Sequence, residues 1–385
     1  MNPEPEFAAP PRSQDTPAPK KVRYAGIDII KILALIFVVT VHSFLHTGFY
    51  STPMSFDFGL FQVFFRWAAF CCVPLFMTVT GYLMSRKKLE RGFYKGMLRM
   101  LVVYVIVSII SVIFNIRFHH YVYTPWAFIR GLFMFSNVQY GWYVEYYLTL
   151  YLLIPFINQA YHGMRTRRNK RIMLMTVCFL FLFAQSFFIG AELATQIKPF
   201  PNFFTRGYPF AYYLIGAYLR DFPPKPKRNR KLRYFAVYCA ALTWTSLVTF
   251  YQCRTNTETG GTWRPWHNDD YAAWPVALMT VMLFLMLFDL KIRSKTACAV
   301  LKRLSNATFA AYLISYIFDC ITYRRLNEAY PAVPDRFRHV PFAVAKNVFW
   351  SMLCGLVIQG GYDLAVLLIR KRKVQKSACR AEIQS

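Results

Sequence analysis

Acidic residues are scarce in this chain of 385 residues, in which 18 Asp and Glu stand against 46 Lys and Arg and only 17% of all residues are charged. Hydrophobic residues make up 56% of the chain, which excludes an intrinsically disordered protein. The nine cysteines follow no repeated spacing, so the sequence predicts neither a disulfide framework nor a zinc site. A net charge of +28 alone would suit a nucleic-acid binder, but the placement of the basic residues argues against that class.

Apolar runs of about 20 residues, long enough to cross ~30 Å of hydrocarbon, recur along the chain. Continuous runs of this length predict helices, because the strands of a membrane barrel are shorter and alternate in polarity. The ten predicted spans are 26–47, 59–84, 97–116, 142–160, 172–190, 207–222, 234–252, 271–290, 307–322 and 341–369. We therefore expect an all-α integral membrane protein with about ten transmembrane helices.

Lys and Arg alternate in density between the segments that connect these spans. Six segments, the first at the N-terminus and the last at 370–380, hold 33 of the 46 basic residues, whereas the five segments on the other side hold ten. Basic loops stay on the cytoplasmic side, so the pattern predicts cytoplasmic N and C termini in a multi-pass protein of the plasma membrane. Because topology accounts for most of the net charge, no nucleic-acid partner is needed.

The chain is predicted to contain one folded unit between two tails. Residues 1–22 are rich in proline, with six prolines in the first 19 positions, and we expect a disordered cytoplasmic tail there. The transmembrane domain is predicted over 23–370, and a basic cytoplasmic tail over 371–385.

Three ionisable residues share one face of the first span. Asp28 and Lys31 are three residues apart, and His42 follows Lys31 by eleven residues, which is about three turns and ~16 Å along a helix. A charge within hydrocarbon is costly, so such residues are functional candidates. Lys31 is expected near the cytoplasmic edge and His42 deep in the span. Two structural alternatives stay open: a snorkelling pair of Asp28 with Lys31, and an interhelical hydrogen bond of His42.

Two more ionisable residues lie within the predicted spans. Arg66 in the second span must face the bundle interior or water, and it needs a partner. Glu145, about one turn inside the fourth span, is the natural partner for Arg66 or a second catalytic group beside His42. His46 lies one turn beyond His42, but no third ligand is evident nearby, so no metal site is expected.

Several motifs resemble the integral membrane acyltransferase family 3, whose polytopic members O-acylate sugars and cell-surface polymers. The family opens with an Asp, a basic residue, ten further residues and a His, as do Asp28, Lys31 and His42. Later blocks that resemble the family are VPLFMTVTGYL (73–83), Trp142 with Tyr151, Leu152 and Pro155, YLIGAYL (213–219) and LSNATFAAYLI (304–314). The resemblance spans roughly 24–369, although Ser315 stands where many members have His.

This resemblance implies a membrane O-acyltransferase that moves an acyl group, most often acetyl, from cytoplasmic acyl-CoA to a hydroxyl of a cell-surface or lipid-linked saccharide. No bound cofactor is implied. His42 would act as general base or transient acyl carrier. Arg66, which would stabilise the thioester oxyanion, and Glu145 are the other catalytic candidates. The residues expected to hold the acyl-CoA donor are Asp28, Lys31, Arg86 and Lys87.

Two other functions remain open at the level of the sequence. The same buried charges would line the pathway of a transporter, such as an exporter of a lipid-linked sugar or small solute. A catalytically silent scaffold in a complex that builds an envelope polymer is the third possibility. The acyl group, the acceptor and the oligomeric state have no signature in the sequence.

Overall fold

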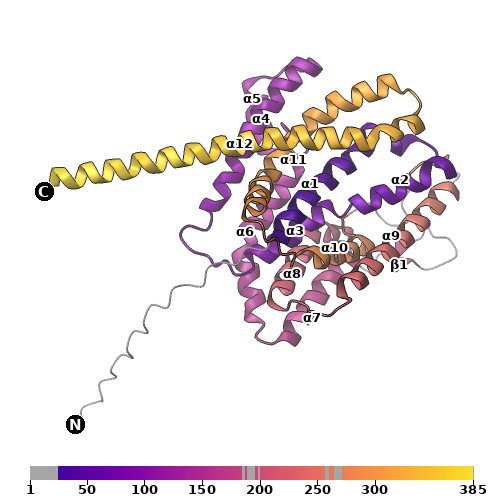
Figure 1. Cartoon of the computed structure of the whole chain (residues 1–385), viewed down its shortest axis with the longest axis horizontal. Coiled ribbons are helices and arrows are strands. Elements are labelled where there is room, and N and C mark those ends of the chain that lie inside the picture. The colour runs from indigo at the N-terminus through magenta and orange to yellow at the C-terminus, as the bar shows by residue number, and fades with distance from the viewer. Residues whose placement is uncertain are drawn as a thin grey trace, which may run out of the picture.

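The computed structural model of the chain describes residues 25–183, 187–188, 196–197, 200–255, 260–263 and 271–384. It shows a helical bundle from which one long helix extends to the C-terminal end (Figure 1). The predicted tail at 1–22 lies outside the described residues.

The α-helices of the described residues are α1 (Ala25–His46), α2 (Phe56–Ala69), α3 (Cys72–Met84), α4 (Lys95–His119), α5 (Pro125–Phe133), α6 (Trp142–Gly163), α7 (Arg167–Cys178), α8 (Tyr208–Asp221), α9 (Arg230–Thr255), α10 (Trp274–Leu287), α11 (Lys295–Ala329) and α12 (Val333–Gln384). The short elements are the 3-10 helices η1 (Phe49–Ser51) and η3 (Asn202–Gly207), the π-helical turn η2 (Phe179–Phe183), and the antiparallel two-residue strands β1 (Phe187–Phe188) and β2 (Gln196–Ile197).

Six helical stretches of the described chain are long and apolar enough to cross a membrane. They are Ala25–His46, Phe56–Met84, Lys95–His119, Arg230–Thr255, Lys295–Ala329 and Val333–Arg372. The prediction of a helical membrane protein is therefore confirmed, whereas the count of ten spans is not. The predicted span 172–190 is not one continuous helix, since α7 passes into η2 and then into β1. Helices α8 and α10 have 14 residues each, and the 22-residue α6, which contains several tyrosines, is not apolar enough.

Side-chain caps and a proline set several helix boundaries. The span that begins at Phe56 consists of two helices, because the chain turns at Phe70 and Cys71 shortly before Pro74. Proline lacks an N–H donor and fits the first turn of a helix, so it favours a new helix start there. The residues whose side chains cap the starts of α2, α5, α7 and α11 are Ser55, Thr124, Thr166 and Ser294.

Helix α1 runs through the interior of the bundle and packs against α3, α11, α12 and α2. Its side chains Ile30, Ala34 and Leu35 are fully buried. Near α1, helices α3 and α8 cross closely at two glycines. A Cβ atom on Gly81 would collide with the carbonyl oxygen of Tyr213, and one on Gly216 would collide with that of Thr78. Only glycine lets these two helices approach so closely.

Three of the segments rich in Lys and Arg, 86–99, 162–171 and 220–233, meet at one end of the bundle. Asp221, at the end of α8, lies 3.8 Å from Arg86 and 2.7 Å from Lys170. Arg230, at the start of α9, pairs with Asp289, just after α10. Three basic connecting segments that the sequence assigns to one side of the membrane are thus neighbours in space. That this end faces the cytoplasm remains a prediction.

Candidate active site

His42 is buried on α1, with 7% of its surface exposed. Its ring stacks on that of Tyr140, with the two ring centroids 3.6 Å apart. Its Nδ1 atom lies 3.5 Å from Oδ2 of Asp319, a fully buried residue of α11. This distance allows attraction when the imidazole is protonated, although Nδ1 makes no aligned hydrogen bond. A base that faces a buried carboxylate is a recurring arrangement in acid–base catalysis.

Two hydrogen-bond donors from other segments hold the Asp319 carboxylate. The hydroxyl of Tyr140 donates to Oδ2 at 2.8 Å, and Nδ2 of Asn347 on α12 donates to Oδ1 at 2.8 Å. The hydroxyl of Thr322 in turn donates to Oδ1 of Asn347 at 2.6 Å. Because both carboxylate oxygens accept hydrogen bonds, the free-energy cost of burying this acidic group is offset. The same bonds fix the orientation of the carboxylate toward His42.

His46, one turn beyond His42, extends the network. Its Nε2 lies 2.9 Å from the Tyr140 hydroxyl oxygen. Since the Tyr140 proton points to Asp319, we assign the proton of this second bond to Nε2 of His46. Burial, and next the Asp319 carboxylate, raise the pKa of Tyr140 well above its ordinary value, so its hydroxyl stays a donor. Among the described residues, no three His, Cys, Asp or Glu side chains are grouped to hold a metal ion.

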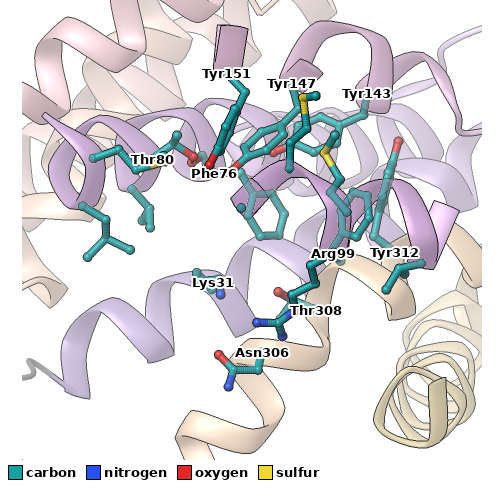
Figure 2. A pocket seen from close by; sticks show the side chains of 18 of the residues that line it. Lys31, Phe76, Thr80, Arg99, Tyr143, Tyr147, Tyr151, Asn306, Thr308 and Tyr312 are labelled. Atoms are coloured by element: carbon teal, nitrogen blue, oxygen red, sulfur yellow. The ribbon is translucent and has the colours of Figure 1, made fainter. Parts of the chain in front are cut away.

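A cavity of about 260 Å³ lies among α1, α3, α4, α6 and α11 (Figure 2). Lys31, Arg99, Asn306 and Thr308 form its polar side, and Lys31 donates a hydrogen bond to a backbone carbonyl of α11 at 2.6 Å. Three tyrosines of α6 stand on the opposite side in Figure 2: Tyr143, Tyr147 and Tyr151. The described lining contains two cations and no acidic side chain, so the cavity suits an apolar chain attached to an anionic group.

Tyr312 connects this cavity to His42. Its side chain lines the cavity, and its ring centroid is 6.2 Å from that of His42. Its hydroxyl donates to the backbone carbonyl of Tyr140 at 2.7 Å, which fixes the ring in place. Val38, about one turn before His42 on α1, lines the same cavity. The cavity therefore extends as far as Tyr312, whose ring lies next to the imidazole of His42.

The other residues predicted to hold acyl-CoA lie elsewhere. Asp28 is buried in the first turn of α1, and it does not line the cavity that contains Lys31. Arg86 and Lys87 line a separate recess of about 920 Å³, which also contains Asp221. Of the four predicted residues, the structure thus brings Lys31 alone into the described lining of this cavity.

Arg66 is buried in an aromatic cage, with 1% of its surface exposed. Its guanidinium carbon lies 4.2 Å from the ring centroid of Trp263, 4.5 Å from Phe70, 5.0 Å from Trp67 and 5.5 Å from Tyr50. Its Nε also donates to the Tyr50 hydroxyl at 2.9 Å. Aromatic faces attract a cation by ~0.5–2 kcal/mol each, which offsets part of the cost of burying it. The cage links α2 to the segment 260–263.

Glu145 is exposed on α6. It lies on the opposite face of the helix from Tyr143 and Tyr147, which line the cavity. The structure therefore does not bring Glu145 into the Lys31 cavity, and the described ion pairs do not join it to Arg66.

Several residues of the site escaped the sequence analysis. Asp319 carried a usable signal, because it is a carboxylate within the predicted span 307–322, and the rule that singled out His42 applies equally to it. Arg99 was not singled out, although it belongs to the basic segment 86–99, which the sequence offers with 162–171 as a contact for the anionic end of the donor. Tyr140 and Asn347 carried none, since their roles depend on contacts with Asp319 that only the folded chain creates.

The fold and the site together define a helical membrane protein with a buried histidine–aspartate pair beside an internal cavity. Residues 24–358 match the acyltransferase domain of acyltransferase family 3. Because the match covers most of the chain, the chain belongs to this family and is a membrane acyltransferase. No curated protein and no solved structure matches it.

Proposed function

We propose that this protein moves an acyl group, with acetyl as the first expectation, from cytoplasmic acyl-CoA to a hydroxyl of a cell-surface or lipid-linked saccharide at the plasma membrane. The observation that carries the proposal is the position of His42. Its Nδ1 faces the buried carboxylate of Asp319, and the cavity lined by Lys31 ends one side chain away. The family supports the reaction class, and a buried imidazole beside a carboxylate supports acid–base chemistry.

Lys31 and Arg99 are the proposed contacts for the anionic end of the acyl-CoA arm. A cavity of about 260 Å³ is smaller than the ~300–1,000 Å³ that drug-sized ligands occupy. We therefore assign it to the pantetheine arm and the acyl group, with the nucleotide outside. Arg86 and Lys87, in the neighbouring basic recess, are proposed contacts for the nucleotide. Asp28, one turn before Lys31, is proposed to support that lysine electrostatically.

His42 acts as the general base in the proposed reaction. As the acceptor oxygen attacks the thioester carbonyl, the proton of the acceptor hydroxyl passes to Nε2 of His42. The C–S bond then breaks, and the departing sulfur takes this proton and leaves as the CoA thiol. Asp319 is a positioning residue, because it favours the tautomer with a proton on Nδ1 and stabilises the charge that develops on the ring.

Arg66 and Glu145 have no chemical step in this proposal. Arg66 lines neither the Lys31 cavity nor the recess beside Asp319, and its aromatic cage supports a role in holding α2 against segment 260–263. Glu145 is exposed on the opposite face of α6 from the cavity. Arg66 and Glu145 therefore lie away from the cavity, whereas His42 is buried at its end.

The test uses membranes that contain the wild-type protein or His42→Ala, supplied with labelled acetyl-CoA. We expect label transfer to extracted glycans to fall by ~10²–10⁴-fold in His42→Ala, because general-base catalysis contributes this much. His339→Ala is the matched control, since His339 stacks on Tyr330 after the end of α11 and lies outside the site. Near-normal transfer by a folded His42→Ala protein would refute the proposal.

A further inference from the structure

A recess of about 550 Å³ lies beside the end of α4 and the last third of α11. His46 at the end of α1 lines it, so it lies toward the opposite end of α1 from Lys31. Asp319 lines it as well. The recess thus reaches the carboxylate that faces His42. The Lys31 cavity and this recess approach His42 and Asp319 from opposite ends of α1.

The walls of this recess combine aromatic faces with polar atoms that make no hydrogen bond. Phe118 and Tyr323 contribute rings. Nε2 of His119 and Oδ1 of Asn327 are buried and without a hydrogen-bond partner in the structure. Nδ2 of Asn327 donates to the backbone carbonyl of His46 at 2.8 Å, so the direction of the amide is set and Oδ1 remains an acceptor. A ligand that offers hydroxyl donors and an apolar ring face matches these walls.

The charges at the rim of the recess are balanced. Arg324 and Glu328 pair with each other at 3.1 Å, and their side chains are 62% and 65% exposed. The guanidinium of Arg324 also lies 5.4 Å from the ring centroid of Phe118. The positive charge of Arg324 is matched by Glu328, and the Asp319 carboxylate also lines the recess, so the charges of the lining favour a neutral ligand over an anionic one.

We propose that this recess is the acceptor site and that it binds a neutral saccharide ring. The inference rests on the proposed function, because it adds the second substrate to the same reaction. Phe118, whose ring stacks on that of Phe114 with the centroids 4.7 Å apart and lies 5.4 Å from the Arg324 guanidinium, contributes apolar ring surface to the recess. His119 and Asn327 bond hydroxyl groups and determine specificity. Asp319 lies on the Nδ1 side of His42, so the hydroxyl to be acylated passes this carboxylate and meets the ring at Nε2.

Cys320 makes occupancy of the recess measurable without catalysis. It is a free cysteine that lines the recess, and Cys298, near the start of the same helix, is a matched control that does not. The probe is methyl β-D-glucoside, and alkylation by N-ethylmaleimide is followed for each cysteine-containing peptide. We expect the glucoside to slow alkylation severalfold at Cys320 and to leave Cys298 unchanged. His42→Ala should keep this protection, whereas His119→Ala should lose it.

Kinetics provide the second measurement. For acyl transfer to methyl β-D-glucoside, we expect Phe118→Ala and His119→Ala to raise the KM of the acceptor about tenfold, the size of one lost hydrogen bond or ring contact. The KM of acetyl-CoA should stay unchanged, because neither residue lines the Lys31 cavity. The matched control is Arg117→Ala, an exposed neighbour on α4 that does not line the recess.

The outcomes separate the two proposals. An active wild type whose Cys320 is not protected, or whose acceptor KM is unchanged in both variants, overturns the acceptor site and leaves acyl transfer standing. Protection of Cys320 by the glucoside, in a protein that transfers no acyl group, supports the saccharide site and refutes the proposed reaction. Equal protection by methyl β-D-glucuronide would overturn the preference for a neutral ring.

Discussion

Asp319 provides the negative charge that faces His42 in the described part of the chain. We predict that Asp319→Asn lowers kcat by ~10²–10⁴-fold, because the amide keeps the shape of the side chain but loses its charge and offers an N–H toward His42. The KM for acetyl-CoA should stay unchanged, since Asp319 does not line the Lys31 cavity. Steady-state kinetics of the purified protein check this split.

Tyr140→Phe is the matched control for Asp319→Asn. It keeps the stacked ring on His42 and removes two hydrogen bonds, the one to Asp319 and the one from His46, while the charge of Asp319 stays in place. We expect a loss of about tenfold in kcat, the effect of losing the bond that orients the Asp319 carboxylate. A normal kcat in Asp319→Asn, or a change confined to the KM for acetyl-CoA, would contradict the positioning role.

The catalytic histidine candidate could be predicted from the sequence, but its surroundings could not. The spacing of Lys31 and His42 within one apolar run predicts two charges on one helix face, and the structure places Lys31 in a cavity that ends near His42. The bond from Tyr140 to Asp319, however, joins residues that are 179 positions apart. Such a pairing depends on how whole helices pack, which a single sequence does not encode locally.

At the scale of helices, the apolar runs predicted where helices form better than how long they are. A helix overlaps each of the ten predicted ranges, but α8 and α10 are only 14 residues long. The hydropathy average also predicted one span where the structure has two helices, α2 and α3. An average over about 19 residues does not detect that Pro74 favours a new helix start. In the predicted run 172–190, α7 ends at Cys178, and η2 and β1 follow, although no local signal predicted this change.

The crossing of α3 and α8 depends on two glycines, and this leads to a prediction about stability. Gly81→Ala should destabilise the protein by ~1–3 kcal/mol, because the new methyl group overlaps a backbone carbonyl of α8 that cannot turn away as a side chain would. We expect a fall of several degrees in the apparent Tm in detergent. Gly360→Ala is the matched control, since a Cβ there meets open space on α12. Equal apparent Tm values for both variants would contradict the close crossing.

At the scale of the whole molecule, the proposed reaction requires that two substrates from opposite sides of the membrane reach the same base. The proposed donor is cytoplasmic and the proposed acceptor is not, so the two substrates must meet within the bundle. The Lys31 cavity and the recess that contains His46 lie toward opposite ends of α1, and His42 lies between them. One central helix can therefore present its base to substrates that arrive from two sides of a membrane.

This arrangement requires that the two ends of the bundle face opposite sides of the membrane, which predicts a labelling pattern. Val122, in the turn after α4, is 94% exposed, and Lys227, between α8 and α9, is exposed at the end where the basic segments meet. In intact cells, an impermeant maleimide should label Val122→Cys beyond the wild-type background. Lys227→Cys should gain label only after permeabilisation, because basic loops stay cytoplasmic. The reverse pattern would place the Lys31 cavity on the outer side, away from cytoplasmic acyl-CoA, and would overturn the proposed direction of transfer.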